Sequence, residues 1–279
     1  MENRVKIDKI HYQTFKGGSK TYFNSSIFFP EEVRRDVFIL YGFVRTADDL
    51  VDAVPQDVEG FGSFRRRYKA GLSGKPTGDV IIDSFVDLLR RRNLDPEWAE
   101  AFLCAMELDL NKKSYTSLEE ILEYTYGSAE VVGLFMARLM NLHTDYNPFA
   151  RMLGRAMQYI NFIRDIEEDR NMGRRYLPSL KEAPLDSLDP EFTRAHPDSF
   201  EAFVRHHIGL YNQWQTQAEE GFSFIPRRYL IPIKTASDMY KWTARRIETH
   251  PPVVYEKKAK PGKMRILLKV LGNALWRGR

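Results

Sequence analysis

Apolar residues recur at helical spacing along almost the whole chain. In residues 31–53 they return every three, four or seven positions, as Val33, Val37, Leu40, Tyr41, Val44 and Val51. Repeats of this kind are typical of amphipathic α-helices. Strand patterns are nearly absent, and the one short candidate, residues 252–255, is too short to form a sheet. The sequence therefore predicts an all-α protein.

The pattern breaks at Pro, Gly and clusters of polar residues, which mark the ends of helices. Residues 179–197 are rich in Pro, Asp and Ser and are predicted to be a loop with one short turn. Pro226 and Pro232 are predicted to interrupt the pattern again. The predicted helices span residues 31–53, 57–72, 78–92, 96–112, 117–142, 148–173, 199–225, 233–249 and 263–277.

The chain has 279 residues, of which 43% are hydrophobic and 13% aromatic, as expected for a globular core. It contains no repeats and no low-complexity tract. The helices on both sides of the longest irregular stretch carry candidate site residues, so the sequence predicts a single domain over residues 1–279. We expect a monomer or a weak homodimer.

The net charge of +4 comes from the C-terminal end, because residues 257–279 contain eight Lys or Arg and no Asp or Glu. The remainder is acidic overall, which argues against a nucleic-acid-binding protein. A single cysteine, Cys104, excludes an internal disulfide and fits a reducing compartment. We expect no signal peptide, no membrane-spanning segment and a cytoplasmic location, with the inner face of the membrane as the alternative.

Two of the predicted helices carry a polar face that ends in a pair of carboxylates. On 148–173 the face has offsets of 0, 3, 7 and 11 and comprises Gln158, Asn161, Asp165 and Asp169. On 31–53 the offsets are 0, 4, 7 and 11, and the face comprises Tyr41, Arg45, Asp48 and Asp52. At 3.6 residues per turn each set lies on one side of its helix. The other sides are apolar, so both polar faces are predicted to point inward.

Four carboxylates in a protein interior require cations, because burial and repulsion both disfavour their charged forms. Oxygen ligands without nearby Cys or His favour Mg²⁺, with Mn²⁺ as the alternative. Mg²⁺ commonly completes its shell with phosphate oxygens, and neighbouring bases suit a diphosphate, namely Arg45, Arg164, Arg174 and Arg175. One Asp-x-x-x-Asp face is more often a solvated surface. Two such faces on apolar helices favour a metal site that assists the departure of a diphosphate.

A third helix, 117–142, has a face of small residues with the same offsets, formed by Tyr126, Ala129, Gly133 and Ala137. Close packing against another helix is the favoured interpretation. The alternative is that the small side chains leave room for a long apolar substrate.

Together these motifs resemble those of the squalene/phytoene synthases, the head-to-head prenyl diphosphate synthases of the all-α isoprenoid synthase fold. The first signature runs from Tyr41 to Asp52, and the second runs from Gln158 to Asp169 and continues as Gly-Arg-Arg-Tyr-Leu-Pro at 173–178. Further matches are an early Ser-x-Ser/Thr-Phe element at residues 19–23, a Tyr-x-x-x-x-Ala-x-x-Val-Gly-like segment at 124–133, and Tyr240. The resemblance covers about residues 15–260.

This resemblance implies helices around a central cavity and a role for each matched residue. The implied metal ligands are Asp48, Asp52, Asp165, Asp169 and Asn161. The aspartates, with Tyr41, Arg45 and Tyr240, form the implied catalytic set. The implied substrate-binding residues are Ser19, Lys20, Thr21, Tyr22, Arg45, Tyr126, Gln158, Asn161, Arg164, Arg174, Tyr176 and Lys257. For Tyr126, ordinary packing is the favoured alternative.

The implied reaction joins two identical prenyl diphosphates. Ionisation of one gives an allylic cation, which a double bond of the other attacks to form a cyclopropylcarbinyl diphosphate. A second ionisation and rearrangement gives a 1-1′ linked hydrocarbon. Two geranylgeranyl diphosphates giving phytoene are favoured, and two farnesyl diphosphates giving squalene or dehydrosqualene are the alternative. The sequence contains no Gly-rich dinucleotide motif, which leaves the use of NADPH open.

Two departures from the family pattern affect basic residues. Thr46 and Ala47 replace a second base that is common after Arg45, and Lys257 and Lys258 stand where relatives tend to carry arginine. Two other functions are alternatives to this interpretation: a terpene cyclase of similar fold, and a non-catalytic assembly or scaffold relative. The retained aspartates argue against both.

The last predicted helix, 263–277, is amphipathic. A stripe at a spacing of four comprises Arg265, Lys269, Asn273 and Arg277, and most of the other residues are apolar. A basic stripe on an apolar helix is typical of a helix lying at a membrane surface. The alternative is a helix docked on the body with its basic edge in water. Since a hydrocarbon product must enter a membrane, we favour peripheral membrane contact.

Overall fold

The computed structural model describes residues 9–15, 29–256, 259 and 261–275. Within these residues there is no β-strand, and the only extended pairings are two isolated bridges, Ser114–Arg175 and Leu180–Ala183. Residues 9–15 are helical. The other α-helices are α3 (Glu31–Asp52), α4 (Val58–Leu72), α5 (Val80–Arg91), α6 (Pro96–Asn111), α7 (Leu118–Thr125), α8 (Val131–Leu139), α9 (Asn147–Arg164), α10 (Ile166–Asn171), α11 (Pro190–Ala195), α12 (Pro197–Glu220), α13 (Arg227–Thr249), α14 (Val253–Glu256) and α15 (Lys263–Leu275). The all-α prediction is confirmed.

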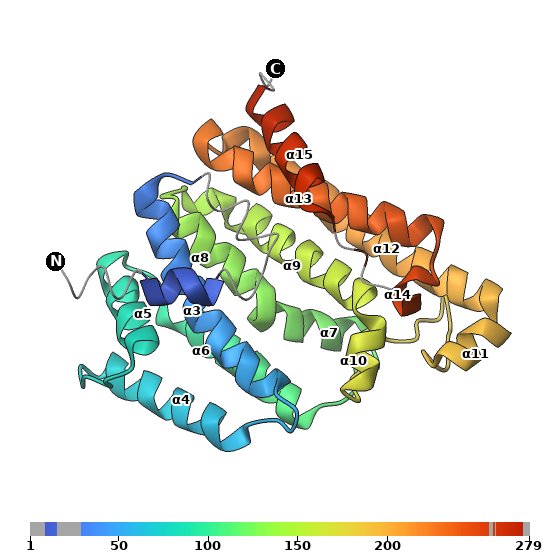
Figure 1. The fold of residues 1–279 in the computed structure, drawn as a ribbon, viewed down its shortest axis with the longest axis horizontal. Coiled ribbons are helices and arrows are strands. Elements are labelled where there is room, and N and C mark those ends of the chain that lie inside the picture. The colour runs from blue at the N-terminus through green and yellow to red at the C-terminus, as the bar shows by residue number, and fades with distance from the viewer. Residues whose placement is uncertain (1–8, 16–28, 257–258, 260, 276–279) are drawn as a thin grey trace.

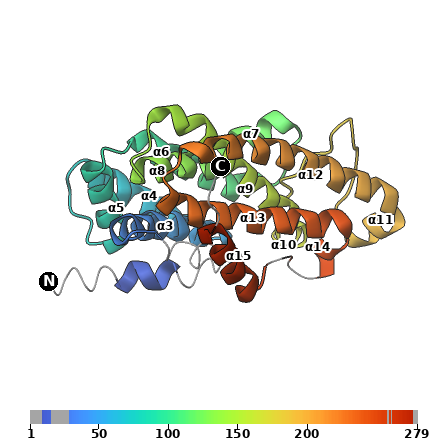
Figure 2. The same cartoon turned by 90° about the horizontal axis from the view of Figure 1, so that it is seen from above.

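α9 lies in the middle of the bundle, between α8 and α12 (Figure 1). α3 packs against α4, α5 and α6 in the N-terminal half, and α13 packs against α9 and α12 in the C-terminal half. α15 lies on the outer side of α13. Seen from above, α15 and the helical segment 9–15 project from the same side of the bundle (Figure 2).

Most helices in the N-terminal half begin at a polar side chain that accepts a hydrogen bond from the first turn. Asp57 accepts from the backbone N–H of Gly60, and Asp79 accepts from those of Ile81 and Ile82. Asp95 precedes Pro96, whose fixed φ suits the first helical position. Such caps satisfy donors that the helix itself leaves unpaired, which explains why these starts were predictable.

The predicted helix 148–173 is not continuous, so this prediction was wrong. α9 ends at Arg164, and α10 begins at Ile166. Asp165 stands between them with φ −100° and ψ 17°, outside the helical region. Its side chain is paired with Arg164, the residue before it, and the side chains of consecutive residues do not face each other on a regular helix.

Two further helix predictions need correction. The predicted helix 117–142 contains a π-helical segment, Tyr126–Glu130, between α7 and α8. Pro232 does not interrupt α13, which starts at Arg227 and continues through it. A proline removes only one backbone hydrogen bond, and buried residues on both sides, such as Tyr229 and Thr235, keep the helix against the bundle. The loop at 179–197 with one short helix, α11, is as predicted.

The face of small residues packs closely against α9. A Cβ atom added to Gly133 would lie 2.2 Å from the carbonyl oxygen of Ala150, and one added to Gly154 would lie 2.4 Å from that of Ala129. These backbones touch because neither glycine has a side chain. Close helix packing, the favoured interpretation of this face, is therefore confirmed at Ala129 and Gly133.

Candidate active site

The first signature places its charged residues on the last three turns of α3. The Arg45 guanidinium lies 3.0 Å from Asp48 Oδ2 and also pairs with Asp49. One turn before Arg45, the ring of Tyr41 stacks on Phe15 of the segment 9–15, with centroids 3.9 Å apart. This segment therefore covers the start of the polar face, while the carboxylates at its other end stay partly exposed.

The second signature is placed by the break between α9 and α10. The backbone N–H of Asp165 donates to Asn161 at 2.8 Å, and the carbonyl of Asp165 accepts from the N–H of Asp169 at 2.9 Å. Arg164 holds the Asp165 carboxylate through Nε, at 2.9 Å, and through Nη2. Asp165 is thus fixed by the backbone on both sides and by one guanidinium.

Arg174 joins the two signatures. Its Nη1 lies 2.5 Å from Asp52 Oδ1, and its Nη2 donates to the carbonyl of Val51 at 2.7 Å. Its backbone N–H donates to the carbonyl of Asp169 at 2.8 Å. Gly173, with φ +71°, makes the turn that allows this reach. Residues more than a hundred positions apart in the sequence therefore meet at one guanidinium.

Two of the carboxyl groups at this meeting point, Asp48 and Asp169, have raised pKa values. Desolvation, and then repulsion by Asp52, raise the pKa of Asp48 to about 7. Desolvation, and then the charge of Asp165, raise the pKa of Asp169 to about 8, with a smaller contribution from Asp52. Asp52 acts on Asp48 of its own helix and on Asp169 of α10, so carboxylates of the two signatures are close enough to repel each other, as a cation-binding arrangement requires.

Arginines are the direct partners of three of these aspartates, Asp48, Asp52 and Asp165. In the part of the chain that the structure describes, no three Asp, Glu, His or Cys side chains form a ready-made metal centre. One possible oxygen ligand nevertheless lacks a partner: Asn161 Oδ1 is buried and accepts no hydrogen bond from a described residue. The Asn161 amide nitrogen points to Gln158 at 3.4 Å. An oxygen donor set with an orphaned amide oxygen fits a hard divalent ion.

Tyr41 of α3 and Tyr240 of α13 are close enough to interact electrostatically. Burial is the main cause that raises the pKa of Tyr41 to about 12, and Tyr240 contributes to the same shift. The phenol of Tyr41 is therefore neutral near pH 7. Tyr240 is only 6% exposed.

Tyr126 begins the π-helical segment, and its ring lies under a guanidinium. The Arg151 side chain is 5.1 Å from the ring centroid and pairs with Glu130, which is fully buried. A second guanidinium, Arg155, holds the other oxygen of Glu130 at 2.6 Å. This ion-pair cluster fixes the place where the helix widens, and π-helical turns often occur at functional sites.

Asp109 is a buried carboxylate near the site that the sequence reasoning missed. It accepts hydrogen bonds from the hydroxyls of Tyr124 and Tyr176, both at 2.7 Å. The Tyr176 hydroxyl is also 3.5 Å from Arg174 Nη1. The available signal was periodicity, because Asp109 is in helical phase with the buried residues Phe102 and Met106. A carboxylate on an apolar face needs a partner.

Two groups of predicted site residues need comment. Arg175 does not face the aspartates: its guanidinium donates to the carbonyls of Leu177, Leu185 and Asp186 in the loop before α11. The prediction that Arg175 flanks a diphosphate was wrong, because its guanidinium N–H groups donate to carbonyls of the loop instead. The remaining group, Ser19, Lys20, Thr21, Tyr22 and Lys257, lies outside the described residues.

Comparison with known proteins identifies the family of the chain. The family model described as Squalene/phytoene synthase matches residues 15–265. The chain belongs to the squalene/phytoene synthase family. It is 26% identical to a 15-cis-phytoene synthase of Pantoea ananas, over 94% of this chain and 90% of that protein. It is 28% identical to a phytoene synthase of Pseudescherichia vulneris, over 82% and 78% of the two chains.

Solved structures show the same fold. A dehydrosqualene synthase with a bound ligand superposes with a TM-score of 0.84 at 21% identity, over 98% of this chain and 96% of that one. The squalene synthase HpnC of Alicyclobacillus acidocaldarius gives a TM-score of 0.78 at 19% identity, over 88% and 94%. As a member of the squalene/phytoene synthase family, the chain is a prenyltransferase with the all-α isoprenoid synthase fold.

Proposed function

We propose that this enzyme condenses two geranylgeranyl diphosphates head to head to give phytoene. The observation that carries the proposal is the contact of Arg174 with Asp52, which brings the two aspartate signatures to one place. Both named sequences reported above are phytoene synthases. The second candidate is squalene or dehydrosqualene from farnesyl diphosphate, which the resemblance to a dehydrosqualene synthase structure favours.

Mg²⁺ is the proposed metal, with Mn²⁺ as the alternative. Asp48, Asp52, Asp165, Asp169 and Asn161 would hold it. When bound, it supplies positive charge to a departing diphosphate. Arg45, Arg164 and Arg174, which lie against these carboxylates, would then be released to the substrate oxygens. Guanidinium groups suit this role because they bind phosphate oxygens through two parallel hydrogen bonds.

Tyr41 and Tyr240 are proposed to face the allylic cation. Their rings present negative faces that attract positive charge, and the attraction is strongest where water is excluded. Tyr240 is buried, and Phe15 shields one face of Tyr41. With its raised pKa, the Tyr41 hydroxyl stays protonated and does not quench the cation as a phenolate.

The direct test is incubation of the purified full chain with geranylgeranyl or farnesyl diphosphate and Mg²⁺, with and without NADPH, followed by extraction of the hydrocarbon. Phytoene from geranylgeranyl diphosphate is expected. Squalene or dehydrosqualene from farnesyl diphosphate would support the second candidate instead. If neither substrate gave a hydrocarbon, the proposed reaction would be wrong.

The variants Asp48→Asn and Asp165→Asn test the assignment of the metal. Each is expected to lower turnover at least about a hundredfold, the order of loss seen when one transition-state contact is removed. Circular dichroism should show an unchanged helical fold. Asp87→Asn is the matched control, since this carboxylate is 70% exposed and, among the described residues, pairs with Arg91 of the same helix. Full activity in both site variants would remove the metal assignment.

A further inference from the structure

α15 is attached to the body by one narrow face. Ile266 and Val270 are buried against Met239 and Ile231 of α13. Asn273, also buried, donates to Thr235 Oγ1 and Asp238 Oδ2, both at 3.1 Å. Asn273 therefore belongs to the docked face, and the prediction that it continues a basic outer stripe was wrong. No helix in the described part of the chain is long and apolar enough to cross a bilayer.

The opposite face of α15 is apolar and exposed. At 100° per residue, its five large side chains fall within an arc of about 100° that is centred away from α13. They are Met264 (69% exposed), Leu267 (49%), Leu268 (61%), Leu271 (52%) and Leu275 (80%). The other described residues contribute only six exposed large hydrophobics, scattered over several elements. So dense an apolar stripe marks an interaction surface.

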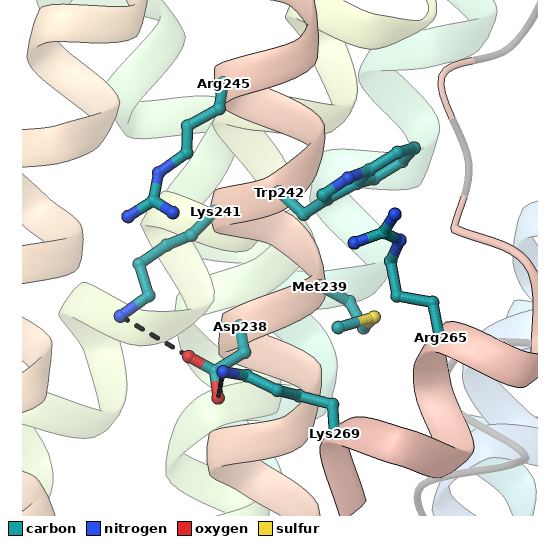
Figure 3. A pocket seen from close by; sticks show the side chains of 7 residues that line it. All are labelled: Asp238, Met239, Lys241, Trp242, Arg245, Arg265 and Lys269. Atoms are coloured by element: carbon teal, nitrogen blue, oxygen red, sulfur yellow. Dashed lines mark ion pairs between the residues drawn. The ribbon is translucent and has the colours of Figure 1, made fainter. Parts of the chain in front are cut away.

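A basic pocket lies along one edge of this stripe, between α13 and α15 (Figure 3). It is lined by one carboxylate, Asp238, and by four cations, Lys241, Arg245, Arg265 and Lys269. Lys241 and Lys269 lie 3.7 and 3.6 Å from Asp238, and Lys241 also pairs with Glu219 outside the pocket lining. The Arg265 guanidinium lies 4.9 Å from the ring centroid of Trp242. Arg245 and Arg265 form no ion pair with any described residue, so the pocket carries uncompensated positive charge.

We propose that α15 and the outer side of α13 form a docking surface for an anionic phospholipid bilayer. The apolar stripe enters the acyl region, and the basic pocket takes a headgroup phosphate. Charge complementarity selects this occupant, because a second copy would bring four more cations against these four. A soluble anion would account for the pocket but not for the stripe. With 13 residues α15 is about 20 Å long, shorter than the hydrocarbon core of about 30 Å, so it lies along the surface.

The test is flotation of the full chain with phosphatidylcholine vesicles, with and without phosphatidylglycerol. Binding is expected only to vesicles that contain phosphatidylglycerol, and it should weaken with added salt. Leu268→Glu should abolish it. Arg265→Gln and Lys269→Gln should each weaken it about fivefold, as expected for one cation near an anionic surface. This result does not depend on the proposed reaction, because it is read without substrate.

The controls are matched on other faces. Val58→Glu changes an exposed apolar residue of α4, and Arg205→Gln removes an exposed cation of α12; both should bind like the wild type. If Leu268→Glu failed to fold, the two charge variants would decide the outcome. The proposal is overturned if the wild type does not float, or if the α15 variants bind normally. It is also overturned if the pocket binds inorganic phosphate without vesicle binding, or if Leu268→Glu converts a dimer into monomers.

Discussion

Asp109 connects the core of the protein to the proposed metal ligands. It is 3% exposed, and each of its oxygens accepts one tyrosine hydroxyl. One of these tyrosines, Tyr176, lies beside Arg174, which holds Asp52. Burial raises the pKa of Asp109 to about 6, and the two tyrosine hydrogen bonds oppose this shift. Asp109 is therefore a positioning residue for Arg174.

We expect Asp109→Asn to lower the free energy of unfolding by about 1–3 kcal/mol. A carboxylate accepts from both tyrosines, whereas an amide accepts at one oxygen and presents N–H to the other hydroxyl, whose proton then lacks an acceptor. Chemical denaturation measures the change. Asp87→Asn removes an exposed ion pair and should lower the free energy of unfolding by less than about 1 kcal/mol. Equal losses in the two variants would contradict the role given to Asp109.

The contact of α8 with α9 depends on glycines, which have no side chain. Replacing one of them by alanine should therefore destabilise the protein, although alanine is the better helix former. Gly133→Ala adds a favourable helix former, yet its Cβ atom would meet the Ala150 carbonyl at 2.2 Å. We expect a net loss of about 1–3 kcal/mol, since overpacking moves the backbone. Gly209→Ala in α12 is the control: no atom lies within 4 Å of its added Cβ, and stability should rise by up to about 1 kcal/mol. Stabilisation by both substitutions, measured by denaturant titration, would refute the close packing.

The contact of α9 with α12 contains a buried neutral histidine. His207 Nδ1 is 2.6 Å from the Tyr159 hydroxyl, and Nε2 is 3.2 Å from the carbonyl of Pro178. Since that carbonyl only accepts, Nε2 carries the proton and Tyr159 donates to Nδ1. Burial is the main cause that lowers the pKa of His207 to about 3.

This depressed pKa predicts acid sensitivity. The unfolded chain, with a histidine pKa of about 6.5, binds a proton that the folded protein rejects. Above pH 6.5, His207 therefore does not lower the free energy of unfolding. As the pH falls from 6.5 toward 3, the free energy of unfolding decreases. Between pH 7 and 5 we expect the wild type to lose about 2 kcal/mol relative to His207→Gln, in parallel denaturant titrations. Parallel pH curves for the two proteins would show that folding leaves the pKa of His207 unchanged.

Across the whole molecule, the features that could be predicted from the sequence are those that depend on residues close together in the chain. Capped starts such as Asp57 and Asp95, and the polar face on α3, depend on near neighbours, and these helices formed as expected. The continuous helix through Pro232 and the inward position of Asn273 depend on packing or on partners elsewhere in the chain. The contact of Arg174 with Asp52 is of the same kind, because only the folded chain brings α3 beside the residues that follow α10.

That long-range contact leads to a prediction about the complete site. Mg²⁺ with inorganic pyrophosphate should bind across both signatures and so stabilise the fold as a whole. At a ligand concentration of about 100 times Kd the gain is about 2.7 kcal/mol, which corresponds to a rise in Tm of about 5–10 °C for a chain near this size. Thermal unfolding in Mg²⁺ plus pyrophosphate, and again with excess EDTA, measures it.

Asp52→Asn and Asp169→Asn should each lose most of this shift, because they remove ligands from opposite sides of the site. Asp87→Asn should keep it, since its carboxylate pairs with Arg91 away from both signatures. If pyrophosphate stabilised the protein equally in EDTA, the arginines alone would bind the anion and the aspartates would not act through a metal. If only Asp52→Asn lost the shift, the metal would be bound by α3 alone, and Arg174 would be a structural link rather than part of the diphosphate site.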